Sequence, residues 1–326
     1  MNRAEAAAKV ILIRLPRGVR TAFHVFKSRV GVAVCLALLL SYATFHDRVY
    51  SDFHCGMPAL RPVSLTEGEL YGRVHEPDLP WFGQPPEELL RLKEELGIKR
   101  YLVGFRATLL EPLFDEITNI RVAAEYVAGS VVHPGEVFSV LKTIGPYTEE
   151  RGYRQGPSYM GGRVVPTIAG GVCKISSVLY NVVILSDLPV VERHPHSMQV
   201  PYLPPGRDAT IAWGAKDFRF RNGRESPLII WAEMTDDTLY IAFYADFDLP
   251  RVEWQHEEIK RTPFETIRRP NPELPPGEEV VVIEGYDGVT VRSSITVTYP
   301  GQSPEVRMLS TDTYRPMTRV IEYGPQ

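Results

Sequence analysis

The sequence predicts an α+β fold: a mixed domain of helices, glycine-rich loops and antiparallel strands, followed by a small all-β module. Two segments, 119–128 and 172–185, repeat apolar residues at helical spacing. Short β-branched and aromatic runs separated by turns dominate after residue 208. Proline and glycine are abundant, with 28 and 25 residues, which is typical of proteins built from short strands and turns.

Length, charge and cysteine content narrow the class of protein. The chain has 326 residues, enough for two domains and a leader, and 44% of them are hydrophobic, so we expect a buried core. The formal net charge is -4, which argues against a nucleic-acid partner. The three cysteines, Cys35, Cys55 and Cys173, are too few for a disulfide scaffold.

The N-terminal part is typical of an exported protein. Residues 1–29 carry seven basic side chains and one acidic one, and the following run, 30–45, has no charged residue. This pattern predicts a transmembrane signal anchor with a cytoplasmic N-terminus and an extracytoplasmic C-terminal part at the cell membrane. A cleaved signal peptide and a buried helix are the alternatives, because 16 residues span only about 24 Å of helix.

Beyond the leader, the sequence pattern divides the chain into four parts. Residues 46–118 are expected to form a spacer and a helical cover, with an amphipathic helix over 85–98. The main domain is expected over 119–264, a proline-rich linker over 265–279 and a small β module over 280–326. Strands are expected at 209–213, 218–221, 228–233, 238–245, 280–284, 289–299 and 318–323.

Cys173 is the best candidate for a reactive residue. It follows Gly170 and Gly171, which let the backbone turn tightly and leave room for a substrate. The start of the helix over 172–185 favours a thiolate through its dipole and free N–H groups, and Lys174 adds a positive charge. The alternative is a small cysteine packed under the helix, because free cysteines are often buried.

A cysteine nucleophile needs a base, and His194 and His196 lie in a proline-containing loop after the helix. Asp208, in a turn before a predicted strand, could orient one of these histidines as the third member of a triad. Each of these three residues is also compatible with an ordinary loop or turn. Because Cys173 and the histidines offer only three ligands without paired spacing, we expect no metal and no other cofactor.

Seven blocks follow one another along the sequence: NIRVAA (119–124), PGEVFS (134–139), GPYTEERGYRQGP (145–157), AGGVCKISSVLYN (169–181), ERHPHS (192–197), PPGRDATI (204–211) and FRFRN (218–222). Together these blocks resemble the VanW family. The tail of the chain resembles the G-five-like β extension often found after VanW domains.

The resemblance implies a role in the bacterial cell wall, in a family associated with glycopeptide (vancomycin) resistance. Some members are understood to be L,D-transpeptidases that use the domain cysteine as nucleophile, and this cysteine falls on Cys173. Their histidine-rich segment falls on His194 and His196. Within these blocks we regard six residues as candidates for substrate binding: Gly170, Gly171, Lys174, Tyr153, Arg221 and Asn222. Arg221 and Asn222 either bind a carboxylate or line a solvated strand face.

The sequence therefore predicts a membrane-tethered cysteine acyl transferase that acts on peptidoglycan stem peptides. Backbone N–H groups of residues 171–174 are expected to form its oxyanion hole. The alternative is a non-catalytic protein that binds peptidoglycan peptide or glycan and contributes to envelope integrity or glycopeptide resistance. A structural adaptor has no specific support in the sequence.

Overall fold

The computed structural model describes residues 70–326 except 111, 113, 161 and 162. The predicted cytoplasmic segment and signal anchor, 1–29 and 30–45, lie outside the described residues, as does the first part of the predicted spacer. Among the residues that the structure describes, no helix is long and apolar enough to span a membrane.

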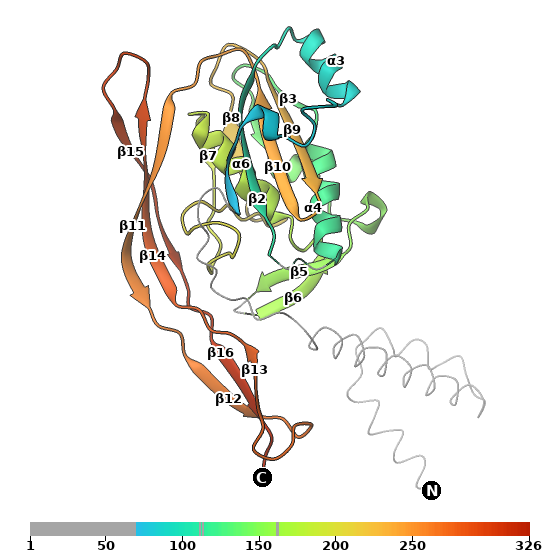
Figure 1. The fold of residues 1–326 in the computed structure, drawn as a ribbon, viewed down its shortest axis with the longest axis vertical. Helices are drawn as coiled ribbons and strands as arrows, with labels where there is room; N and C mark the ends of the chain where they lie inside the picture. Colours follow the sequence, from blue (N-terminus) through green and yellow to red (C-terminus); the bar gives the residue numbers. More distant parts are fainter. Residues whose placement is uncertain (1–69, 111, 113, 161–162) are drawn as a thin grey trace, which may run out of the picture. The chain divides into compact units, whose positions relative to one another are not determined.

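A five-stranded antiparallel sheet forms the centre of the main domain (Figure 1). Two of its strands come from the segment that we predicted as a spacer and helical cover, so that prediction is corrected. β2 lies between β1 and β10 because its apolar side chains Val103, Phe105 and Ala107 are buried in the core. The strand order is β1 (Tyr71–Val74), β2 (Tyr101–Thr108), β10 (Thr238–Tyr244), β9 (Leu228–Thr235) and β3 (Ser130–Val132).

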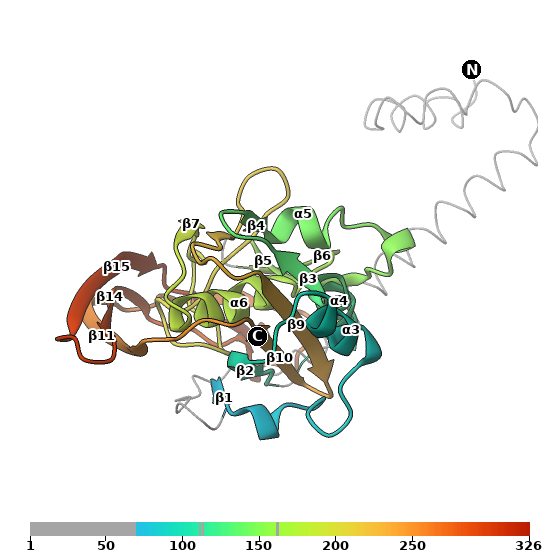
Figure 2. The same cartoon turned by 90° about the horizontal axis from the view of Figure 1, so that it is seen from above.

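Helices cover both faces of this sheet, as the alternation of its side chains requires. On one face, α4 (Phe114–Val127) packs against β9, and α6 (Cys173–Leu185) packs against β2 and β10 (Figures 1 and 2). Trp231 and Tyr244 point to the opposite face, where they form a second apolar cluster with Leu89 of α3 (Glu87–Glu95). The three predicted helices are therefore present, although α4 begins earlier than predicted.

Smaller elements complete the main domain. They include a three-stranded sheet, β4 (Val137–Ser139), β8 (Arg219–Arg221) and β7 (Val190–Glu192), and the hairpin β5 (Gln155–Met160) and β6 (Arg163–Ile168). Short helical turns are η4 (Glu76–Asp78), α5 (Val140–Ile144) and η5 (Glu149–Arg151). The strand predicted at 209–213 is absent from the described structure, where Ala212 forms only an isolated bridge with Lys216.

The C-terminal part is a β module of two three-stranded sheets. It begins earlier than we predicted, because β11 pairs with β14 along its length. The segment predicted as a linker is part of the module, since β12 pairs in parallel with β16. The first sheet is β11 (Arg251–Thr262), β14 (Gly288–Thr298) and β15 (Glu305–Tyr314), and the second is β12 (Thr266–Pro270), β16 (Arg319–Tyr323) and β13 (Glu279–Ile283). The fold is thus α+β with an all-β C-terminal module, as predicted.

Candidate active site

The turn before α6 is held by a close approach of two backbones. A Cβ atom on Gly170 would overlap the carbonyl group of Gly156, and one on Gly156 would lie 2.5 Å from the Gly170 oxygen. The buried Asn119 amide donates to the carbonyl oxygens of Gly170 at 2.9 Å and Arg154 at 3.0 Å, and its own oxygen accepts from the Arg154 N–H at 2.7 Å. These contacts fix the point at which α6 starts.

Cys173 is the first residue of α6, as the sequence predicted within one residue. It is partly exposed, whereas the rest of the helix is buried. Its sulfur lies 3.5 Å from the Ile211 carbonyl oxygen and 3.6 Å from the Thr210 Oγ1. The thiol is therefore held between the helix N-terminus and the 210–211 segment.

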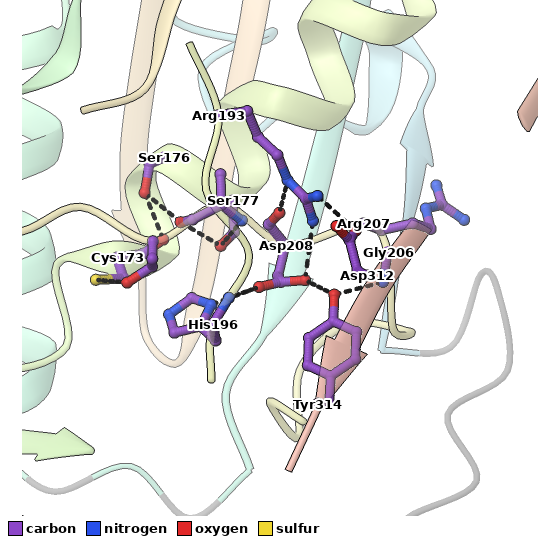
Figure 3. Close-up of polar contacts among 12 residues, drawn as sticks. Cys173, Ser176, Ser177, Arg193, His196, Gly206, Arg207, Asp208, Asp312 and Tyr314 are labelled. Atoms are coloured by element: carbon purple, nitrogen blue, oxygen red, sulfur yellow. Dashed lines mark hydrogen bonds and ion pairs between the residues drawn. The ribbon is translucent and has the colours of Figure 1, made fainter. Parts of the chain in front are cut away.

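Polar side chains inside α6 bind the segment that carries Asp208. Ser176 Oγ donates to the Ala209 carbonyl at 2.6 Å, and Ser177 Oγ accepts from the Ala209 N–H at 3.0 Å (Figure 3). Asn181 Nδ2 donates to the Arg207 carbonyl at 2.8 Å. Because buried polar groups need partners, these serines and the asparagine set the register between α6 and residues 207–209.

His196 and Asp208 form the next part of the site. Asp208 Oδ2 lies 2.6 Å from His196 Nδ1 and accepts the His196 backbone N–H at 2.7 Å (Figure 3). The Asp208 side chain is fully buried. Since Nδ1 is bound to the carboxylate, Nε2 is the imidazole nitrogen left for the thiol and a substrate.

The ionisation of these groups is strongly coupled. Burial raises the pKa of the Cys173 thiol, but hydrogen bonding with His196 and its charge outweigh burial and lower the pKa from 9.0 to about 7. Burial lowers the pKa of His196, but Asp208 and Cys173 outweigh it and raise the pKa to about 9. Burial raises the pKa of Asp208, but the hydrogen bond with His196, the His196 charge and the Arg193 charge outweigh burial and hold this pKa below its usual range. Near neutral pH the arrangement therefore favours a thiolate beside an imidazolium, which is the reactive form of a cysteine nucleophile.

The structure separates the two candidate histidines. His194 Nε2 lies 3.1 Å from Glu192 Oε1, and its side chain is 38% exposed, against 13% for His196. Hydrogen bonding with His196 is the largest of the effects that lower the pKa of Cys173. His196 is thus the histidine that the fold brings to the thiol.

Several residues that we expected to bind substrate have structural partners instead. Tyr153 is fully buried and donates to the Ile144 carbonyl at 2.6 Å. Asn222 is also buried, and its amide donates to the Val132 and Ser226 carbonyls at 2.8 and 2.9 Å. Our substrate-binding assignment of these two residues is therefore corrected, because their side chains hold backbone inside the domain.

The remaining candidates lie around the helix start or away from it. Lys174 forms a buried ion pair with Glu116 and lies over the Tyr202 ring, so its charge is directed to Glu116 rather than to the thiol. Gly171 packs against Glu116 with a φ of 98°, a conformation that favours glycine. Arg221 is exposed on β8, at the pairing position opposite Val137.

Tyr147 is a residue that we did not identify from the sequence. Its hydroxyl is buried and has no hydrogen-bond partner among the described residues. Burial raises the pKa of Tyr147, and the charge of Cys173 raises it further. The only signal for Tyr147 in the sequence was its position in the 145–157 block.

The backbone donors that we expected for the oxyanion hole are partly occupied. The Val172 N–H donates to the Ala169 carbonyl, and the Lys174 N–H donates to the Gly171 carbonyl.

In the part of the chain that the structure describes, no group of three or more histidine, cysteine, aspartate or glutamate side chains could hold a metal ion. The Cys173, His196 and Asp208 side chains lie in the order in which a nucleophile, a proton-transfer group and an orienting carboxylate are arranged in a catalytic triad.

Comparison with known proteins connects this site to a family. A model of the family described as VanW like protein matches residues 115–244, and a G5 domain model matches residues 253–326. The uncharacterized protein YoaR of Bacillus subtilis (strain 168) is 39% identical over 178 residues, which cover 55% of this chain and 57% of YoaR. The vancomycin B-type resistance protein VanW of Enterococcus faecalis (strain ATCC 700802 / V583) is 26% identical over 169 residues, which cover 50% of this chain and 60% of VanW.

The chain thus spans less than two thirds of the length of these relatives. Among solved structures, the IgA1 protease G5 domain is 25% identical, covering 24% of this chain and 95% of that chain at a TM-score of 0.17. The HP0197-G5 structure is 21% identical, covering 23% and 97% at a TM-score of 0.14. From the sequence matches, the chain contains a VanW-like domain over residues 115–244 and a G5 domain over residues 253–326 as its C-terminal module.

Proposed function

We propose that this protein is a cysteine-dependent acyl transferase that acts on peptidoglycan stem peptides. The VanW-like and G5 domains indicate a cell-wall-associated protein. The observation that supports catalysis most directly is the arrangement of Cys173, His196 and Asp208 in the order nucleophile, proton carrier and orienting carboxylate.

In the first step, the Cys173 thiolate attacks the carbonyl carbon of an amide in the donor peptide. A C–S bond forms and the carbonyl electron pair moves to the oxygen. As that pair returns, the C–N bond breaks and the His196 imidazolium gives its Nε2 proton to the leaving amine. Asp208 stabilises the imidazolium and holds its tautomer. The product of this step is a thioester on Cys173.

In the second step, an amine from a neighbouring stem peptide attacks the thioester carbonyl. Neutral His196 accepts the proton of that amine, the C–S bond breaks, and the thiolate is restored. The new amide bond is a crosslink between two stems. Water as the acceptor would instead trim the donor peptide.

The Tyr147 hydroxyl is the side-chain donor that we assign to the oxyanion formed in both steps. A buried hydroxyl without a partner is costly in a folded protein, and a catalytic role is one recognised explanation for such a group. Burial keeps Tyr147 protonated, so it is able to donate at neutral pH.

The location of the protein is part of the proposal. The basic segment 1–29 and the uncharged apolar run 30–45 support a single-pass anchor in the cell membrane with the VanW-like and G5 domains outside. Such an anchor would keep the enzyme near a polymeric substrate. The proposed partners are peptidoglycan stem peptides and, for the G5 domain, wall peptide or glycan.

The proposal is tested by incubating the purified protein with muropeptides that carry stem peptides. Intact-protein mass spectrometry should detect an acyl adduct on Cys173, and chromatography should detect crosslinked or trimmed products. Cys173→Ala should give neither, whereas His194→Gln, a matched change outside the triad, should give both. If Cys173→Ala and the unaltered protein formed equal amounts of crosslinked or trimmed product, the proposed cysteine-dependent activity would be rejected.

A non-catalytic wall-binding protein is the second candidate, because the G5 match covers residues 253–326, which are nearly all of the C-terminal module. In that case the unaltered protein and Cys173→Ala would co-sediment equally with purified sacculi, and no acyl adduct would form on either. Detection of an adduct on Cys173 would exclude this candidate as the full description.

A further inference from the structure

The C-terminal module contacts the loop that carries Asp208. A Cβ atom on Gly206 would overlap the hydroxyl of Ser293 on β14, so the loop lies directly against that strand. Trp254 of β11 packs edge-to-face against Tyr180 of α6, with ring centroids 5.9 Å apart. The two modules therefore share a packed boundary next to the proposed triad.

Tyr314, at the end of β15, reaches across this boundary to the triad carboxylate. Its hydroxyl accepts the Gly206 N–H at 2.7 Å and donates to Asp208 Oδ1 (Figure 3). Tyr314 is 1% exposed, so neither hydrogen bond competes with bulk water. Since Oδ1 is bound by Tyr314, the other carboxylate oxygen, Oδ2, is left facing His196.

A second residue of the module, Asp312 of β15, adds a negative charge to the site through Arg193. Arg193 donates from Nη2 to Asp208 Oδ1 at 3.3 Å and from Nη1 to Asp312 of β15. All three side chains are at most 7% exposed. The His196 imidazolium and Arg193 are thus faced by the carboxylates of Asp208 and Asp312 and by the Cys173 thiolate. Loss of the Asp312 charge would remove one of the negative charges near the imidazolium, which disfavours its charged form.

We propose that the C-terminal G5 module completes the catalytic centre, with Tyr314 as a positioning residue for Asp208 and Asp312 as the counter-charge that supports the imidazolium. This inference rests on the proposed function. It implies that the VanW-like domain does not hold a competent triad by itself. The wall-binding and catalytic parts of the chain are then parts of one site.

The test uses Tyr314→Phe in the full chain, with the pH midpoint of thiol–disulfide exchange at Cys173 as the readout. Loss of a hydrogen bond to a charged group corresponds to about a tenfold change in equilibrium. We therefore expect the midpoint to rise and the exchange rate at pH 7 to fall, together with a loss of acyl transfer. Tyr286→Phe is the matched control, because this tyrosine lies in the same module and its buried hydroxyl has no partner among the described residues.

A purely structural role for Tyr314 would lower the melting temperature but leave the midpoint where it is in the unaltered protein, and that result would overturn the inference. If Tyr314→Phe does not fold, Asp312→Asn provides the same readout, and an unchanged midpoint there would equally overturn it. The inference and the proposed function fail separately. If His196→Gln does not change the pH midpoint of thiol exchange, the proposed triad is rejected. If His196→Gln changes this midpoint but Tyr314→Phe and Asp312→Asn do not, only the role of the module is rejected.

Discussion

Replacing His196 with glutamine tests whether the imidazole sets the ionisation of Cys173. Glutamine keeps a polar side chain of similar size but cannot carry a proton. With the imidazole present, the pKa of the Cys173 thiol is about 7, against an ordinary value of 9.0. In the variant, burial is no longer opposed by the imidazolium, so we expect a thiol pKa of 9 or above.

The magnitude follows from these two values. At pH 7, half of the thiol is ionised when its pKa is 7, and about 1% when its pKa is 9, so the thiolate fraction falls about 50-fold. A thiolate of higher pKa is a better nucleophile, which returns about 6- to 10-fold in disulfide exchange. The net expectation at pH 7 is a rate about 5- to 8-fold lower, with the midpoint of the pH profile moved from about 7 to 9 or above.

The assay follows release of the thiol from a small aromatic disulfide between pH 5 and 10, on folded protein. Cys173→Ala gives the background from the other thiols. His194→Gln is the matched control, since this imidazole pairs with Glu192 and should leave the midpoint near 7. The reasoning is refuted if His196→Gln and the unaltered protein share one midpoint, or if His194→Gln produces the larger shift.

Three further predictions concern the surroundings of the thiol. Gly170→Ala should lower stability by about 3 kcal/mol or more in denaturant unfolding, because its Cβ would overlap the backbone of β5, whereas Gly83→Ala, with open space around it, should be near neutral. Tyr147→Phe should leave stability and thiol exchange unchanged but lower the rate of acyl transfer about 100-fold, and an unchanged rate would remove Tyr147 from the mechanism. Lys174→Met should lower the free energy of unfolding by about 3 kcal/mol, because it leaves the buried Glu116 without its partner. The pH midpoint of thiol exchange should not change. The additional substitution Glu116→Leu should restore most of the lost stability.

Local patterns explain what the sequence could predict. The apolar repeat of α6 and the glycine pair before it are contiguous, so both the helix and the position of Cys173 at its start were accessible. The strands β9 and β10 form a hairpin with clear alternation and were predicted close to their true ends. The β2 strand was missed because Gly104 interrupts its pattern and because its partner β10 is distant in the sequence.

The site could be predicted only as a set of candidates. Choosing His196 over His194 required the position of Asp208, which lies 12 residues further along the chain. Tyr314 is 106 residues from Asp208, and no local pattern connects them. Tyr153 and Asn222 lie in blocks that resemble the family, but only the packing shows that their polar groups are consumed by backbone partners.

The position of β2 determines how the protein can be divided for experiments. The family match starts at residue 115, after both β1 and β2. In a fragment trimmed to that match, one edge of β10 would have unpaired backbone N–H and C=O groups. The fragment would also lack β2, one of the strands against which α6 packs. Open strand edges of this kind recruit other chains, so such a fragment should self-associate rather than report on the activity of the intact protein. Expression designs should therefore retain the chain from before Tyr71.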